Sequence, residues 1–147
     1  MTDFVTAFKS TIDKIGKDLA DAKGLPFIDM DDITKSSELL HSSRDALVWE
    51  FLVFDPAPVD PLYSFVFRIG SRAVKDAANY TSLGLLDALQ KVFPISSRHE
   101  IRNMSGAVAG PVVGIIHITD LRIDPQQHDK DSAIRMISIT GKCVKEG

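Results

Sequence analysis

The sequence predicts an α+β fold: a single domain with a mostly antiparallel sheet, an N-terminal helix and a second helix after a β-hairpin. Two observations carry this prediction. Apolar residues recur at helical spacing in two separate segments, and strand-like segments follow one another in runs rather than alternating with helices, which disfavours a doubly wound parallel fold. The 147 residues are about the size of one domain, so we expect residues 1–147 to share one core.

The first helix is expected from Asp3 to Lys23. Thr2 or Asp3 can accept hydrogen bonds from its first free amides, Gly24 supplies a left-handed stop, and Pro26 prevents continuation. Mixed charges on the opposite face favour packing on a core over a membrane-surface role. The apolar face consists of Phe4, Phe8, Ile12, Ile15 and Leu19.

A long loop is expected from Leu25 to Arg44, with at most a helical turn around Ser37 to His41. Asp29, Asp31 and Asp32 lie in it, but the glycine and glutamate that an EF-hand calcium loop needs are missing. We therefore expect a solvated acidic loop.

A β-hairpin should follow this loop. Ala46 to Phe54 is almost continuously apolar and rich in aromatic and β-branched residues, which is typical of a largely buried strand. Residues 55–61 contain three prolines and are expected to be a connection. The returning strand has a period of two, with Tyr63, Phe65, Phe67 and Ile69 on one face.

The second helix is expected between Ala73 and Phe93, with its best-formed part starting at Thr81 or Ser82 and Pro94 ending it. Its apolar face consists of Leu85, Leu86, Leu89, Val92 and Phe93.

Three strands complete the predicted sheet. They run from His99 to Met104, from Val112 to Ile123 and from Ser132 to Val144. A glycine-rich loop, residues 105–111, and a polar loop, residues 124–131, separate them.

Composition disfavours or excludes several function classes. The net charge of −3 gives no overall basic field, which disfavours a dedicated nucleic-acid binder but leaves a local basic face open. Cys143 is the only cysteine, so an intramolecular disulfide and a cysteine-rich zinc site are excluded, and a reducing compartment fits best. The N-terminal residues do not have the pattern of a secretory leader, and Val112 to Ile118 is too short to span a bilayer, so we expect a soluble intracellular product with no membrane contact.

No motif predicts catalysis, a cofactor or a metal. Gly106, Gly110 and Gly114 have the wrong spacing for a dinucleotide or phosphate loop. The four histidines, His41, His99, His117 and His128, lack metal-ligand spacing, and His128-Asp129 is expected to be solvated. We therefore expect a protein that is not an enzyme, with no catalytic, cofactor-binding or metal-binding residue.

Two patterns allow a functional interpretation beside a structural one. His117 and Cys143 fall on neighbouring predicted strands and could meet as a nucleophilic pair, although cysteine is more often a small buried hydrophobe. Trp49 and the aromatic row of the hairpin could stack on bases, but only Arg68 and Arg72 are nearby, so we favour an aromatic face that packs on the helices.

Three segments resemble the tail terminator proteins of long-tailed bacteriophages, also called tail completion or minor tail proteins. They are Phe65 to Gly70, Leu85 to Phe93 and Ile134 to Val144. The order of elements and the length are also similar to those of this family, and the similarity covers most of the chain.

The resemblance implies a structural virion protein that forms a ring, typically a hexamer. Such a ring caps the tail tube, ends its polymerisation, and provides the head-joining surface. The implied partners are other copies of the chain, the tail tube protein and the head-tail connector or neck proteins, with DNA passing through the lumen without sequence-specific binding. The implied location is the head-proximal end of the virion tail, after assembly in the host cytoplasm.

Contact residues follow only from the expected loop positions, since loops at sheet ends commonly carry recognition. The glycine-rich loop is the favoured contact, and three arginines are candidates for lining the lumen. The alternatives are another connector or stopper protein of the neck, a non-phage module that binds peptide by strand addition, and a small enzyme without a recognisable motif. The interface candidates are Gly106, Gly110, Pro56, Pro58, Gln126, Gln127, Arg98, Arg102 and Arg122.

Overall fold

A computed structural model describes residues 4–31, 45–56, 62–74, 80–106, 108–125, 127–129 and 132–145. Two helices and seven strands lie along this part of the chain. Their bounds are α1 Phe4–Lys23, β1 Phe27–Asp29, β2 Ala46–Pro56, β3 Leu62–Val74, α3 Tyr80–Val92, β4 Arg98–Arg102, β5 Val112–Ile123, β6 Gln127–Asp129 and β7 Ser132–Lys145.

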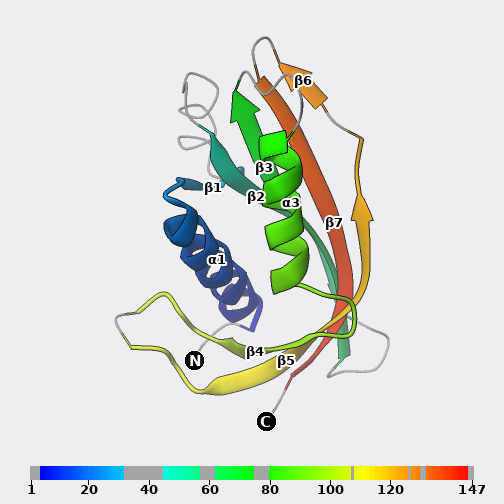
Figure 1. Cartoon of the computed structure of the whole chain (residues 1–147). Helices are drawn as coiled ribbons and strands as arrows, with labels where there is room; N and C mark the ends of the chain where they lie inside the picture. The colour runs from blue at the N-terminus through cyan, green and yellow to red at the C-terminus, as the bar shows by residue number, and fades with distance from the viewer. Residues whose placement is uncertain are drawn as a thin grey trace.

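The strands form one sheet in the order β1-β2-β3-β7-β5-β4, with β6 beside the start of β7. Every pair is antiparallel except β1 with β2, which is parallel. Helices α1 and α3 both lie on the concave face of the sheet, which curves around them (Figure 1). The predicted α+β fold, with a mostly antiparallel sheet, is therefore confirmed.

Helix α1 buries the apolar face that its spacing predicts. Phe8 is fully buried, and its ring centroid lies 4.9 Å from that of Phe65. Burying such a side chain contributes about 1.5–3 kcal/mol. Gly24 ends the helix with φ of 68°, and the amide of Leu25 donates to the carbonyl of Ala20 at 2.9 Å. The predicted left-handed stop is confirmed, whereas Thr2 and Asp3 lie outside the described residues.

Helix α3 covers the middle of the same face. Leu85, Leu86, Leu89 and Phe93 are buried, and the ring of Phe93 lies 5.7 Å from that of Phe67. The aromatic row is thus core, as the structural interpretation predicts. None of the helices in the described ranges is both long and apolar enough to cross a membrane.

The second helix lies within its predicted range, whereas one predicted boundary of the hairpin is wrong. Strand β3 continues to Val74, which pairs with Ser132, and α3 begins at Tyr80, next to the predicted start at Thr81 or Ser82. Strand β2 continues into the predicted connection as far as Pro56, which pairs with Tyr63. A proline fits there because β1 flanks β2 only up to Trp49, so the missing amide breaks no pairing on that side. Residues 57–61 lie outside the described ranges.

Two short strands replace parts of the predicted loops. Strand β1 lies within the predicted loop Leu25 to Arg44, and β6 lies within the predicted loop 124–131. Three-residue strands leave no periodic signal in a sequence, which is why spacing predicts neither. Asp29 is not solvated as expected: its carboxylate accepts a hydrogen bond from Lys9 Nζ at 2.5 Å. The segment Ser37 to His41 lies outside the described residues.

Candidate functional site

The candidate site lies on the face of the sheet opposite α1 and α3. No helix of the described ranges lies on this face, which we call the helix-free face. Side chains alternate between the two faces of a strand. Phe65, Phe67 and Ile69 point into the helical core, so Val66 and Arg68 point the other way. One end of this face holds a small second apolar cluster around Ala46, Val48 and Met136.

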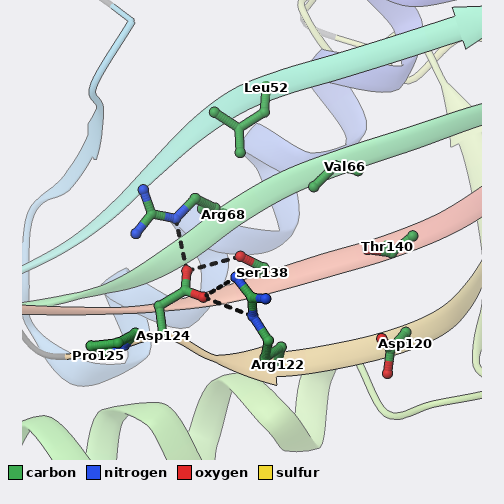
Figure 2. A pocket seen from close by; sticks show the side chains of 9 residues that line it. All are labelled: Leu52, Val66, Arg68, Asp120, Arg122, Asp124, Pro125, Ser138 and Thr140. Atoms are coloured by element: carbon green, nitrogen blue, oxygen red, sulfur yellow. Dashed lines mark hydrogen bonds and ion pairs between the residues drawn. The ribbon is translucent and has the colours of Figure 1, made fainter.

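A shallow pocket of about 590 Å³ occupies the middle of the helix-free face. Figure 2 shows its walls, which come from strands β2, β3, β5 and β7. Its lining residues are Leu52, Val66, Arg68, Asp120, Arg122, Asp124, Pro125, Ser138 and Thr140.

Asp124 is the centre of a hydrogen-bonded cluster in this pocket. Its carboxylate accepts from Arg68 Nε at 2.9 Å and from Ser138 Oγ at 2.8 Å on one oxygen. The other oxygen accepts from Nε and Nη2 of Arg122, each at 3.2 Å. Arg68 also donates from Nη1 to Glu50 at 2.8 Å. We call Glu50, Arg68, Arg122, Asp124 and Ser138 the Asp124 cluster; it joins β2, β3, β5 and β7.

The cluster holds Asp124 ionised. Its side chain is only 8% exposed, and this burial alone would raise its pKa. Hydrogen bonds from Ser138, Arg68 and Arg122 outweigh burial and hold the pKa of Asp124 below the ordinary value of 3.8. A carboxylate whose pKa is lowered and whose oxygens are occupied by donors is a poor general base, so the cluster is built to fix strands rather than to move protons.

The pocket also lacks the charge of an anion site. Its two arginines are matched by two aspartates, Asp120 and Asp124, so the lining is formally neutral. Beside it, a bulge between Phe51 and Val53 breaks the register of β2 with β3. Leu52 is 47% and Val53 41% exposed there, so the predicted buried strand is buried in its first half only.

The alternative nucleophilic pair is excluded by geometry. Cys143 is buried in the helical core opposite Ile116, whereas His117 is opposite Lys142 and points to the helix-free face. Burial raises the pKa of the Cys143 thiol to about 12, so it is not a nucleophile at neutral pH. Among the described residues, no group of three or more His, Cys, Asp or Glu side chains could hold a metal ion.

The glycine-rich loop is anchored at its base and exposed at its tip. The amide of Gly110 donates to the carbonyl of Asn103 at 3.0 Å, and Nη1 of Arg102 donates to the carbonyl of Gly110 at 3.1 Å. Ser10 of α1 accepts a hydrogen bond from the amide of Met104 at 3.0 Å. The tip is open to solvent, with Gly106 exposed and Val108 83% exposed.

The three candidate lumen arginines lie far apart along the sheet. Arg102 is opposite Val112 and Arg98 is opposite His117 on β5, whereas Arg122 lies near the far end of that strand. At about 3.3 Å per residue, Arg102 and Arg122 are separated by roughly 30 Å along the strand. Arg102 pairs with Glu100 and Arg122 with Asp124.

The remaining candidates lie at strand ends or beyond the described residues. The backbone of Pro56 ends β2, and that of Gln127 begins β6 opposite Ile134. Pro58 and Gln126 lie outside the described residues.

Most of the Asp124 cluster does not follow from the sequence. The residue pattern places Asp124 in a polar loop, and neither Arg68 nor Ser138 belongs to a motif. The available signal is the alternation on β3, which directs Arg68 away from the aromatic core. Spacing does not show which strands flank β3 and β7, so it does not show the partners of Arg68 either.

Comparison with known proteins identifies the fold alone. No protein-family model and no curated protein matches the sequence. Among solved structures, one similar chain has a TM-score of 0.58 and 13% sequence identity, and the match covers 96% of this chain and 94% of that chain. Over nearly its whole length, the chain therefore shares its fold with a solved structure.

Proposed function

We propose that this protein is a ring-forming structural component of a phage tail: a tail terminator that caps the tube, ends its polymerisation and provides the head-joining surface. The observation that carries the proposal is the helix-free face. The helices of the described ranges cover one side of the sheet, and the second face has exposed Leu52 and Val53 beside the Asp124 cluster. The resemblance in element order supports the same assignment.

The helix-free face is the ring contact in this proposal. A contact between two different surfaces of neighbouring copies closes into a ring when its rotation divides a full turn. The Asp124 cluster joins four strands through hydrogen bonds. The face is therefore ordered before the partner binds, and its side chains lose little conformational freedom on binding. The lining of the pocket carries no net formal charge, so it does not repel another protein by an excess of one charge.

Light scattering and negative-stain imaging test the ring. The purified chain, alone or with tail tubes, should form rings, and Leu52→Glu should abolish them by placing a charge in the contact. Leu83→Glu is the matched control, because Leu83 is similarly exposed but lies on α3. A chain that stays monomeric even with tubes present, or equal effects of the two variants, would reject this contact.

Tube capping is tested at the glycine-rich loop. Replacing Gly106 and Gly110 by alanine fits the structure, since an added Cβ meets nothing closer than 3.5 Å at either position. The double variant should therefore fold and form rings but cap tubes poorly, because the tip becomes stiffer. Unchanged tube length and unchanged particle yield would remove the loop from the tube contact.

A neck or stopper protein is the second candidate, since it would share the size and the ring. The two differ in what the ring binds. A terminator binds the end of a tube made from the tail tube protein alone, whereas a stopper needs the connector, so a pull-down with isolated tubes distinguishes them.

A further inference from the structure

The outer edge of β5 is open along its second half. Strand β4 pairs with β5 only as far as His117, and the last hydrogen bonds on that side join Ser96 and Ser97 to Ile118. Within the described ranges, no strand pairs with residues Thr119 to Ile123 on the side of β5 that faces away from β7. We call these five residues the open segment. Four of its five residues are exposed, and Ile123 is 47% exposed.

Backbone groups of the open segment point outward at alternate residues. The amide of Asp124 donates to Met136 of β7 at 2.9 Å, so Arg122 and Asp120 also direct their backbone groups toward β7. Leu121 and Ile123 therefore direct theirs away from the sheet. The amide of Leu121 donates to the carboxylate of Asp120 at 3.0 Å. Such an edge is a template for another strand.

The side chains of the open segment are complementary to themselves. Asp120 and Arg122 lie on the helix-free face, on either side of Leu121 (Figure 2). In an antiparallel pair of two open segments centred on Leu121, Asp120 of each copy is opposite Arg122 of the other. Opposite charges directly across two strands are favourable.

We propose that a second copy of this chain docks on the open segment by two-fold antiparallel strand pairing centred on Leu121. The two sheets then become one. The outward groups of Leu121 and Ile123 form the new hydrogen bonds, and each Asp120 exchanges the Leu121 amide for Arg122 of the second copy. Exposed Ile95 lies next to Ser96, at the Ile118 end of the segment, so the two-fold axis brings it toward Ile123 of the second copy.

This contact goes beyond the proposed ring. A two-fold contact joins like surfaces and stops at two copies, so it cannot close a ring of single chains. It uses the edge of β5, whereas the ring contact uses the face around Leu52. The two contacts are therefore independent, and either forms without the other.

Charge exchange tests the dimer in a Leu52→Glu background, where the ring contact is removed. Asp120→Arg and Arg122→Asp should each be monomeric by light scattering, because like charges face each other twice. An equimolar mixture of the two should recover the mass of a dimer, since every facing pair is again opposite. A monomeric parent, dimeric single variants, or a mixture that stays monomeric would each overturn the proposal.

Hydrogen exchange provides a measurement that does not depend on charge. On raising the protein concentration, the amides of Leu121 and Ile123 should exchange at least tenfold more slowly, whereas that of Asp124, already bonded to β7, should not change. Ile123→Pro removes one outward donor without breaking a bond to β7 and should give a folded monomer. If both amides exchange at the same rate at all concentrations, or if the proline variant remains a dimer, the edge is not the contact.

Discussion

At the scale of single residues, Asp124 is the most constrained side chain of the helix-free face. Three side chains from three strands donate to its two oxygens, although it follows the last residue of β5 and its sequence neighbours predict a solvated loop. Its burial depends on those donors, because an ionised carboxylate is costly to bury unless it is paired.

Removing this charge should destabilise the fold. Asp124→Asn removes the carboxylate that Arg68, Arg122 and Ser138 share, and we expect a loss of about 2–4 kcal/mol in the free energy of unfolding. For a chain of this size that lowers Tm by roughly 10 °C. Thermal denaturation measures it, and Asp87→Asn is the control because its ion pair with Lys91 is exposed and contributes little. Equal Tm values for the two variants would contradict a structural role for the cluster.

The stability that Asp124 contributes should depend on pH. Its pKa is lower in the folded chain than in the unfolded chain, so the unfolded state binds the proton more readily. The contribution is complete above the unfolded pKa and is lost as the pH falls through the folded pKa. Urea titrations should give a difference between wild type and Asp124→Asn that is constant above about pH 5 and shrinks below about pH 4. A difference in unfolding free energy that increases as the pH falls would contradict this prediction.

Cys143 should be inert in the native protein. Its thiol is fully buried, and its pKa is raised to about 12. Iodoacetamide at neutral pH should label it only after denaturation, as mass spectrometry would detect. Labelling of the folded chain within minutes would contradict the burial of Cys143 in the core opposite Ile116.

At the scale of elements, close packing requires glycine at some positions and would tolerate a side chain at others. A Cβ on Gly141 of β7 would collide with the carbonyl of His117 and lie 2.6 Å from the ring of Phe65. Gly84 of α3 has nothing within 4 Å of such a Cβ. The close approach of β7 to β5 therefore depends on Gly141, whereas α3 would tolerate a side chain at Gly84.

Alanine substitutions at these two positions should have opposite effects. Gly84→Ala should stabilise the chain by about 0.5–1 kcal/mol, because alanine has the higher helix propensity. Gly141→Ala should destabilise it by roughly 1–3 kcal/mol through overpacking in the sheet. Urea denaturation of both variants measures the two signs, and a stabilising Gly141→Ala would contradict the close approach of β7 to β5.

At the scale of the whole molecule, one helical layer on one face of the sheet leaves two distinct surfaces for association. The helix-free face and the open segment of β5 differ in symmetry and share Asp120 and Arg122, but Leu52 belongs to the first surface alone and Ile123 to the second alone. Ring formation and strand pairing should therefore respond to separate substitutions. Leu52→Glu is expected to remove the ring and keep the dimer, whereas Ile123→Pro is expected to keep the ring and remove the dimer.

A variant with both substitutions tests whether these two contacts account for all association. Leu52→Glu combined with Ile123→Pro should be monomeric at all concentrations accessible to light scattering, with an unchanged circular dichroism spectrum. Oligomers that survive in the double variant would show that a third surface carries association.

Much of the fold is predictable because it follows from periodicity. The spacing of Phe4, Phe8 and Ile12 sets α1, and the alternation of Phe65 and Phe67 sets β3, since each pattern buries one face. The bounds of β5 match the prediction at both ends, because the glycine-rich loop and the polar segment after Ile123 interrupt its apolar run. The bulge at Leu52 leaves no such signal, and it is what exposes part of an apolar strand.

The sequence by itself determined the class of fold, the aromatic core and the absence of a recognisable catalytic motif, because these depend on local spacing and residue type. Only the tertiary structure decided which strands are neighbours outside the predicted hairpin of β2 and β3. Sheet order brings Arg68 and Ser138 to Asp124 and separates His117 from Cys143. Within the described ranges, it also leaves the outer edge of β5 without a neighbouring strand beyond Ile118. Pairing between distant strands is set by the packing of the whole core, and no window along the chain contains it.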